Sequence, residues 1–283
     1  MNMTQRGAVI IGPTIINIDF PSSEQDVLPG VKWGQIEAFP SPAYWAYQVF
    51  ARRLEINAIN YKLGQTLKEE VGACLLGGHG IPAAIGIAAF NMLKSYGAFE
   101  TESPSEDCLY EWLSQPINTG NKSVRYRFAK QKARYLAAAL NKLEAEAPPV
   151  ESGRQLRDWL TTIPGIGYKT ASWIARNWLS ADDVAILDIH ILRAGLLGGF
   201  FPGNLTVERN YLELEELFIQ FSKAMGVKTS ELDAIIWYEM QASSSTVFNL
   251  LESLREQPIV KLKPRSRRTQ NRQTDSGQTL MLF

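Results

Sequence analysis

The sequence predicts an all-α protein of two helical lobes with a cleft between them, preceded by a short irregular, β-like N-terminal segment. Three observations predict this class. Apolar residues recur at three- and four-residue spacings over most of the chain after residue 40. Few segments after residue 32 alternate apolar and polar residues as a half-buried strand does. A Pro-Gly-Ile-Gly turn at 164–167 separates two helical segments and predicts a tight hairpin.

Length and composition are those of a globular protein. The 283 residues can bury a sizeable core, and 45% apolar and 20% charged content are ordinary values. Because the net charge is zero, any nucleic-acid surface must be a local patch or must use backbone N–H groups and helix dipoles. We divide the chain into an irregular segment at 1–40, a helical domain at 41–260 and a basic tail at 261–283.

Several classes of protein are disfavoured at this stage. Two cysteines, Cys74 and Cys108, are too few for a disulfide framework or a four-cysteine iron–sulfur cluster. The N-terminus lacks the basic region and long apolar run of a signal peptide, and no apolar stretch reaches the length needed to span a bilayer. We therefore expect a monomer in the cytoplasm, at the nucleoid, without a metal ion or a cofactor.

The first half of the chain changes from β-like to helical. Short β-like runs at Ala8–Ile11 and Ile15–Phe20 are broken by Gly12-Pro13. Pro82 is placed to start a helix, and Pro148-Pro149 stops one. Helical spacing in this half predicts helices over 44–59, 67–76, 83–96, 105–112 and 124–145.

The second half is helical around and beyond the hairpin. Thr206 is suited to cap a helix whose apolar residues form one stripe, and further helices are predicted over 230–242 and 246–255. The members of the stripe are Tyr211, Leu214, Leu217, Phe218 and Phe221.

The Pro-Gly-Ile-Gly turn has the chemistry of a phosphate site. Gly165 and Gly167 let the chain reverse tightly, and the lack of a Cβ lets backbone N–H groups come close to a ligand. The helix that follows directs the positive end of its dipole at the same place, so a phosphate can be held without net protein charge. The turn alone leaves binding without catalysis open, because helix-hairpin-helix turns also occur in non-catalytic modules of polymerases, ligases and helicases.

Lys169 and Asp188 add a reaction to this turn. Lys169 lies in the first turn of the second helix, where the dipole favours the neutral amine that acts as a nucleophile. Asp188 follows nineteen residues later (169 to 188) and is suited both to cap the next helix and to stabilise a positively charged sugar as a base departs. The alternatives are a lysine that only touches a phosphate and an aspartate that only caps. His190 is either a packed or capping residue or a phosphate contact.

Further candidate residues lie on predicted helices before and after the hairpin. Asp233 and Trp237 are four residues apart and share a helix face. Alternatively, Ser230 and Asp233 form a capping box and Trp237 belongs to the core. Trp173 is expected in the core, and the loop at 77–82 either lines the cleft or only connects two helices. A basic face, either DNA-facing or simply solvated, is formed by Arg125, Arg127, Lys130, Lys132 and Arg134.

The motif PGIGYK, the nineteen-residue step from lysine to LDIH, and the segment LDAIIWY resemble the helix-hairpin-helix DNA glycosylase superfamily, most closely the 8-oxoguanine DNA glycosylases. The resemblance is strong over 156–195, weaker over 205–242 and slight over 1–100. It implies a two-lobed glycosylase fold with the active site in the cleft and double-stranded DNA as the partner. Transferred to this sequence, it makes Lys169 and Asp188 catalytic, Gly165, Gly167 and His190 DNA-binding, and Asp233 and Trp237 part of the base pocket.

The same resemblance implies a bifunctional mechanism. The target nucleotide is flipped out of the duplex, the Lys169 amine displaces the base to form a Schiff base, and β-elimination cuts the strand. The missing cysteine cluster argues against the iron–sulfur branch. Two alternatives stay open: a glycosylase for a different modified base, because the N-terminal third departs from the family, and a non-catalytic DNA-binding protein, which the Lys169–Asp188 spacing disfavours.

The C-terminal tail contains a second resemblance. From Lys261 on the chain is basic and polar, which is typical of a disordered segment that solubilises the domain or binds phosphates. Its last six residues, Gln278–Phe283, resemble the short peptides that bacterial proteins insert into the sliding clamp. A terminus that packs on the domain is the alternative.

Overall fold

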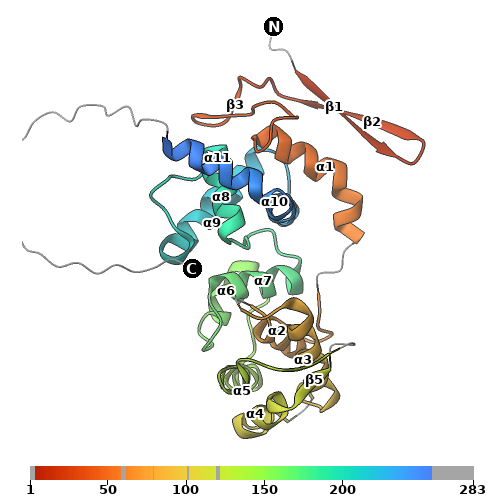
Figure 1. The fold of residues 1–283 in the computed structure, drawn as a ribbon, viewed down its shortest axis with the longest axis vertical. Coiled ribbons are helices and arrows are strands. Elements are labelled where there is room, and N and C mark those ends of the chain that lie inside the picture. Colours follow the sequence, from red (N-terminus) through yellow and green to blue (C-terminus); the bar gives the residue numbers. More distant parts are fainter. Residues whose placement is uncertain (1–3, 59–61, 79, 101, 119–121, 257–283) are drawn as a thin grey trace, which may run out of the picture.

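The computed structural model describes residues 4–58, 62–78, 80–100, 102–118 and 122–256, and over these ranges the chain is mostly helical, as predicted (Figure 1). The helices are α1 (Pro42–Ala58), α2 (Leu67–Leu76), α3 (Ala83–Ser95), α4 (Glu106–Ser114), α5 (Ala129–Ala145), α6 (Gly153–Leu160), α7 (Tyr168–Leu179), α8 (Ile189–Gly198), α9 (Val207–Ala224), α10 (Thr229–Ala242) and α11 (Ser244–Glu256). The strands are β1 (Gln5–Ile11), β2 (Thr14–Phe20), β3 (Asp26–Leu28), β4 (Val31–Lys32), β5 (Pro116–Asn118) and β6 (Ser123–Arg125).

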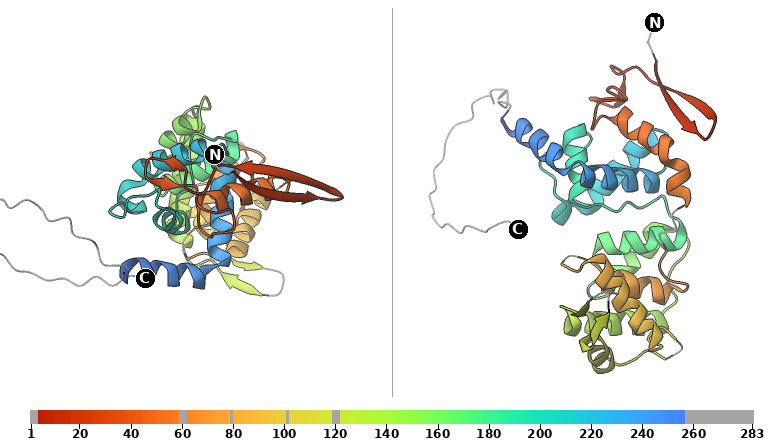
Figure 2. Two further views of the ribbon diagram at one scale, coloured as in Figure 1. Left: turned by 90° about the horizontal axis from the view of Figure 1, so that it is seen from above. Right: turned by 45° about the vertical axis from the view of Figure 1, so that its right-hand side comes forward.

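Buried apolar residues form two separate cores, which define two lobes. The N/C lobe joins residues 20–49 to residues 185–247, and the middle lobe contains residues 71–184. Figures 1 and 2 show α2–α7 gathered on one side of the molecule and α1 with α8–α11 on the other. The chain therefore crosses between the lobes twice, and the second crossing falls between Val184, in the middle core, and Ala185, in the N/C core.

Side-chain caps explain where several helices begin. Thr66, Ser105 and Ser152 each accept a hydrogen bond from the backbone N–H three residues ahead, at the starts of α2, α4 and α6. Thr206 occupies the predicted N-cap of α9 but makes no such bond with its side chain. The predicted stripe of α9 is buried except at Leu217, which is half-buried. Within the described residues no helix combines the length and the apolar character needed to cross a membrane.

The prediction of a helix over 124–145 is wrong at its start. Val124 belongs to β6, where it pairs with Ile117 of β5, and α5 begins only at Ala129. Val124 has a spacing compatible with the following helix, but a β-branched side chain also suits a strand, and pairing with Ile117 decides in favour of the strand. Arg125 and Arg127 consequently precede the helix.

The N-terminal segment is more regular than expected. The two β-like runs pair over their full length as an antiparallel hairpin, from Gln5 opposite Phe20 to Ile11 opposite Thr14. Gly12, at φ +56°, supplies the left-handed residue of the turn. The hairpin projects from the N/C lobe (Figure 2), and the Tyr47 hydroxyl of α1 anchors it by donating to the Ala8 carbonyl at 2.8 Å.

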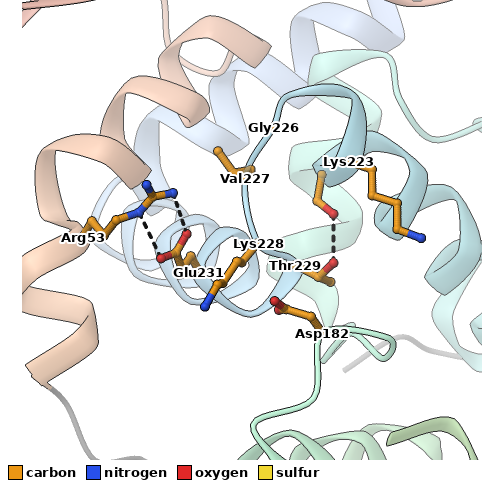
Figure 3. A pocket seen from close by; sticks show the side chains of 9 residues that line it. Arg53, Asp182, Lys223, Gly226, Val227, Lys228, Thr229 and Glu231 are labelled. Carbon is orange, nitrogen blue, oxygen red and sulfur yellow. Dashed lines mark hydrogen bonds and ion pairs between the residues drawn. The ribbon is translucent and has the colours of Figure 1, made fainter. Parts of the chain in front are cut away.

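A cavity of about 530 Å³ lies in the N/C lobe, at the turn between α9 and α10 (Figure 3). Arg53 of α1 and Glu231 of α10 line one side of it and form an ion pair at 3.0 Å. Lys223 and Lys228 also line the cavity, but none of the residues predicted to act on DNA does so. The predicted catalytic and DNA-binding residues therefore lie outside this cavity.

Candidate active site

The hairpin between α6 and α7 uses its two glycines differently. Gly165 has φ +86°, and a Cβ there would overlap the ring of Tyr135, so both the turn and its packing require glycine. Gly167 has an ordinary φ of −90° at the N-cap of α7, and a Cβ there would meet nothing within 4 Å. The packing of the protein does not require glycine at 167, whereas a ligand approaching the backbone would.

The start of α7 presents unpaired donors at this open position. The Gly167 carbonyl accepts the first helical bond, from the Ala171 N–H at 2.9 Å. The N–H groups of Tyr168 and Lys169, which come before Ala171, have no acceptor within the helix. The helix dipole adds partial positive charge at the same place. This surface is suited to an anion such as a DNA phosphate.

Lys169 and Asp188 are brought together beside the hairpin. The Lys169 Nζ atom lies 3.5 Å from Asp188 Oδ2, across the junction between the two lobes. Lys169 is 47% exposed, whereas Asp188 is 10% exposed. Asp188 is also the N-cap of α8, because its Oδ1 atom accepts from the N–H groups of His190 at 2.8 Å and Ile191 at 3.2 Å. One carboxylate oxygen thus holds the helix and the other faces the amine.

The segment that carries Asp188 is held by buried polar side chains of α9. Glu215 accepts from the Ala185 N–H at 3.0 Å. The Tyr211 hydroxyl donates to the Ala185 carbonyl at 2.8 Å and accepts from the Leu187 N–H at 3.2 Å. Because Tyr211 and Glu215 are buried, these bonds are shielded from water. Burial also raises the pKa of the Glu215 carboxyl.

The Asp233 carboxylate, from α10, holds Ile186, the residue between Ala185 and Leu187. Asp233 Oδ2 accepts from the Ile186 N–H at 3.1 Å, and Oδ1 accepts from the Arg176 guanidinium of α7 at 2.5 Å. Asp233 is only 2% exposed, and burial raises its pKa to about 6. The sequence places Asp233 in the base pocket, and in the structure Arg176 and the Ile186 N–H occupy its two oxygens.

The alternative expectation for this region, a capping box and a tryptophan in the core, is wrong. Ser230 and Asp233 do not form a capping box, because α10 begins at Thr229 with Lys228 as its N-cap. Trp237 is 44% exposed and does not belong to the core. Trp173 was expected in the core and is 40% exposed. Four-residue spacing places Asp233 and Trp237 on the same side of α10, yet Asp233 is buried and Trp237 is exposed, while Ile236 and Met240 on another side of the helix stay buried.

His190 and Trp237 lie next to each other at the surface. Their rings meet edge to face with centroids 6.3 Å apart, and His190 is in the first turn of α8, directly after Asp188. Trp237 therefore adds an exposed aromatic surface beside the helix start that Asp188 caps. Among the described residues, His, Cys, Asp and Glu side chains form no group of three that could hold a metal ion.

Several residues of the site were missed by sequence reasoning. Tyr211 was assigned only to an apolar stripe, and Glu215 was not singled out. The signal was present in α9, because Glu215 directly follows the buried Leu214 and is therefore a charge inside the apolar stripe. On α7, Ser172 and Arg176 follow Lys169 at three and seven residues, which places all three on one helix face.

Two helical lobes, a hairpin within the middle lobe and a lysine–aspartate pair across the junction between the lobes define a helix-hairpin-helix protein of the DNA glycosylase class. The sequence model of the 8-oxoguanine DNA glycosylase family matches residues 55–227, and the chain belongs to that family. A relative from Methanocaldococcus jannaschii, an 8-oxoguanine DNA glycosylase/AP lyase, is 37% identical over 123 residues, which are 41% of this chain and 58% of the relative.

Two further similarities extend over more of the relatives. The 8-oxoguanine DNA glycosylase/AP lyase of Thermoplasma acidophilum is 35% identical over 160 residues, 54% of this chain and 75% of that protein. The crystal structure of the 8-oxoguanine DNA glycosylase of Thermotoga maritima matches with a TM-score of 0.51 and 25% identity, over 69% of this chain and 95% of that one. The N-terminal hairpin lies outside the residues that the family model matches.

Proposed function

We propose that this protein is a bifunctional DNA glycosylase/AP lyase that excises 8-oxoguanine from DNA through a Schiff base on Lys169. The single observation that carries the proposal is the 3.5 Å approach of Lys169 Nζ to Asp188 Oδ2 beside an open helix N-terminus. A pure binding hairpin has no need of an amine paired with a fixed carboxylate. The relatives named above supply the substrate, 8-oxoguanine.

The chemistry follows from the exposure of the two side chains. Lys169 attacks C1′ of a flipped nucleotide as its free amine, the bond from C1′ to the base breaks, and the base leaves with its electron pair and takes up a proton that the attacking nitrogen gives up. Asp188, fixed by its cap bonds, stabilises the positive charge that develops on the sugar. Opening of the sugar gives the Schiff base, loss of a C2′ proton expels the 3′ phosphate, and water then releases Lys169.

DNA binding is assigned to the hairpin and to the neighbouring basic surface. The N–H groups at Gly167 and the start of α7 hold one backbone phosphate, and His190 is placed to contact it or the next one. Four exposed cations form no ion pair within the described part of the chain: Arg125, Arg127, Lys130 and Arg134. Arg134 lies over the ring of Tyr135, at 5.2 Å, and Tyr135 packs on Gly165, so this surface adjoins the hairpin.

Base recognition is assigned to Trp237. Its exposed ring, next to His190, offers a flat surface on which a flipped purine can stack. Asp233 has no place in this contact. Gln278–Phe283 lies outside the described residues, so binding to the sliding clamp through this peptide stays a proposal, as do a monomeric state and action at the nucleoid.

The test is borohydride trapping on duplexes that each carry one lesion. The wild-type protein is expected to form a covalent adduct with 8-oxoguanine duplex, and Lys169→Gln is expected to form none. A stronger adduct with another lesion would support the alternative of a different modified base. Binding without an adduct on any duplex would support the non-catalytic alternative and overturn the proposal.

A further inference from the structure

We propose that Asp233 is a positioning residue that sets the separation of Lys169 from Asp188. The proposal rests on the function proposed above, and it concerns how the two lobes hold the reacting groups rather than what they react with. Asp233 touches neither Lys169 nor Asp188 in the contacts of the described residues, so it acts through the elements that carry them.

One face of α7 carries three polar residues that all point to the crossing segment 185–188. Lys169 meets Asp188 directly, at 3.5 Å. Ser172 reaches the segment through Glu215, to which it donates at 3.3 Å. Arg176 reaches it through Asp233. The catalytic pair is thus one of three parallel connections between α7 and this segment.

The Asp233 connection joins an ion pair with α7 to a backbone hydrogen bond from the crossing segment. Its Oδ1 atom binds Arg176 at 2.5 Å, and its Oδ2 atom binds the Ile186 N–H at 3.1 Å. Ile186 lies two residues before Asp188, where the chain has just left the middle lobe. A shift of Asp233 therefore moves the start of α8 relative to α7. The distance from the Asp188 carboxylate to the Lys169 amine changes with it.

A second ion pair on α10, between the buried Glu231 and the partly exposed Arg53, provides a control. Glu231 is 4% exposed and forms two bonds with Arg53 of α1, at 3.1 and 3.0 Å, on the cavity shown in Figure 3. Like Asp233 it is an acid near the start of α10 whose partner is an arginine from another helix. Unlike Asp233 it bonds to no residue of the segment 185–188. Loss of Glu231 should therefore affect stability without affecting the catalytic distance.

The experiment compares Asp233→Asn with Glu231→Gln in the full chain. We measure single-turnover base release, the Kd for lesion duplex and thermal unfolding. Asp233→Asn is expected to slow base release about tenfold to a hundredfold with little change in Kd, because a small misplacement of reacting groups is costly. Glu231→Gln is expected to lower Tm about as much as Asp233→Asn does and to leave the rate of base release unchanged. A folded Asp233→Asn protein with the wild-type rate would overturn the proposal.

A double variant keeps the proposal testable if Asp233→Asn fails to fold. Replacing both charges, as in Arg176→Met with Asp233→Leu, removes the unpaired buried charge and should recover stability. It cannot restore the bond to the Ile186 N–H, so base release should stay slow. Recovery of the wild-type rate in this variant would show that the pair is only structural. If the wild-type protein itself traps no duplex, the proposed function fails instead.

The pH profile gives a readout that a structural role would not produce. Arg176 from α7 and Asp182 from the loop after α7 face Asp233, and burial raises its pKa to about 6. A raised pKa means that the stability from this group is present below about pH 4 and is lost as pH rises through 6. When the pH is lowered from 7 to 5, base release by the wild-type protein should therefore fall. Over the same range the free energy of unfolding of the wild type should rise relative to that of Asp233→Asn. A flat wild-type profile, or the same inflection in Asp233→Asn, would contradict the proposal.

Discussion

The two members of the candidate catalytic pair are held in opposite ways. Lys169 is nearly half exposed, and in the described structure its amine has one partner, Asp188. Asp188 is almost buried, caps α8 with one oxygen, and follows three residues whose N–H groups all bind side chains of α9 or α10. In the proposed mechanism Lys169 has to reach a sugar carbon and is the more exposed of the two, whereas Asp188 is fixed by its cap bonds before a substrate arrives.

The largest effect expected from this comparison is that of Asp188→Asn. Asparagine caps a helix about as well as aspartate, so the fold and the DNA affinity should persist. Only the negative charge beside the sugar is lost, and base release should fall about a hundredfold to a thousandfold. Single-turnover kinetics with a parallel measurement of Kd checks this, and an unchanged rate would remove Asp188 from the mechanism.

The two glycines of the hairpin provide a second comparison, between Gly165, which the fold requires, and Gly167, which a ligand would require. Gly165→Ala combines a positive φ with overlap on the Tyr135 ring and should cost about 2–4 kcal/mol of stability. Gly167→Ala meets open space and should leave stability nearly unchanged, while its methyl group displaces the phosphate and weakens duplex binding about tenfold. Denaturant unfolding and duplex titration on both variants separate the two roles. Equal DNA binding by Gly167→Ala and the wild type would argue against a phosphate at this turn.

The smallest expected effect concerns the basic surface beside the hairpin. Arg134→Gln should lower the magnitude of the slope of log K for DNA binding against log salt concentration by about one. The change should be equal for lesion-containing and undamaged duplex. Lys132→Gln is the matched control, because Lys132 points inward and donates to the carbonyls of Leu75 at 2.6 Å and Gly77 at 3.1 Å. It should reduce stability and leave the salt dependence alone. The reverse pattern would place the DNA on another face.

Sequence reasoning succeeded where the signal is local. The hairpin, the first-turn position of Lys169 and the capping position of Asp188 follow from turn residues, apolar periodicity and cap preferences over short stretches. It failed at Val124, where pairing with Ile117 overrode a compatible helical spacing. It failed again at Trp173, because helical spacing does not show whether an aromatic residue faces the core or the solvent.

The sequence by itself determined the class of fold, the hairpin and the identity of the amine and the carboxylate, because each depends on neighbours a few residues apart. Only the tertiary structure decided how Asp188 is held, since Tyr211, Glu215 and Asp233 come from helices far along the chain and meet its backbone only after the lobes pack. A buried acid such as Glu215 or Asp233 can accept a hydrogen bond from any donor that the packing brings to it. For that reason no spacing in the sequence distinguishes an aspartate that reads a base from one that holds the backbone beside it.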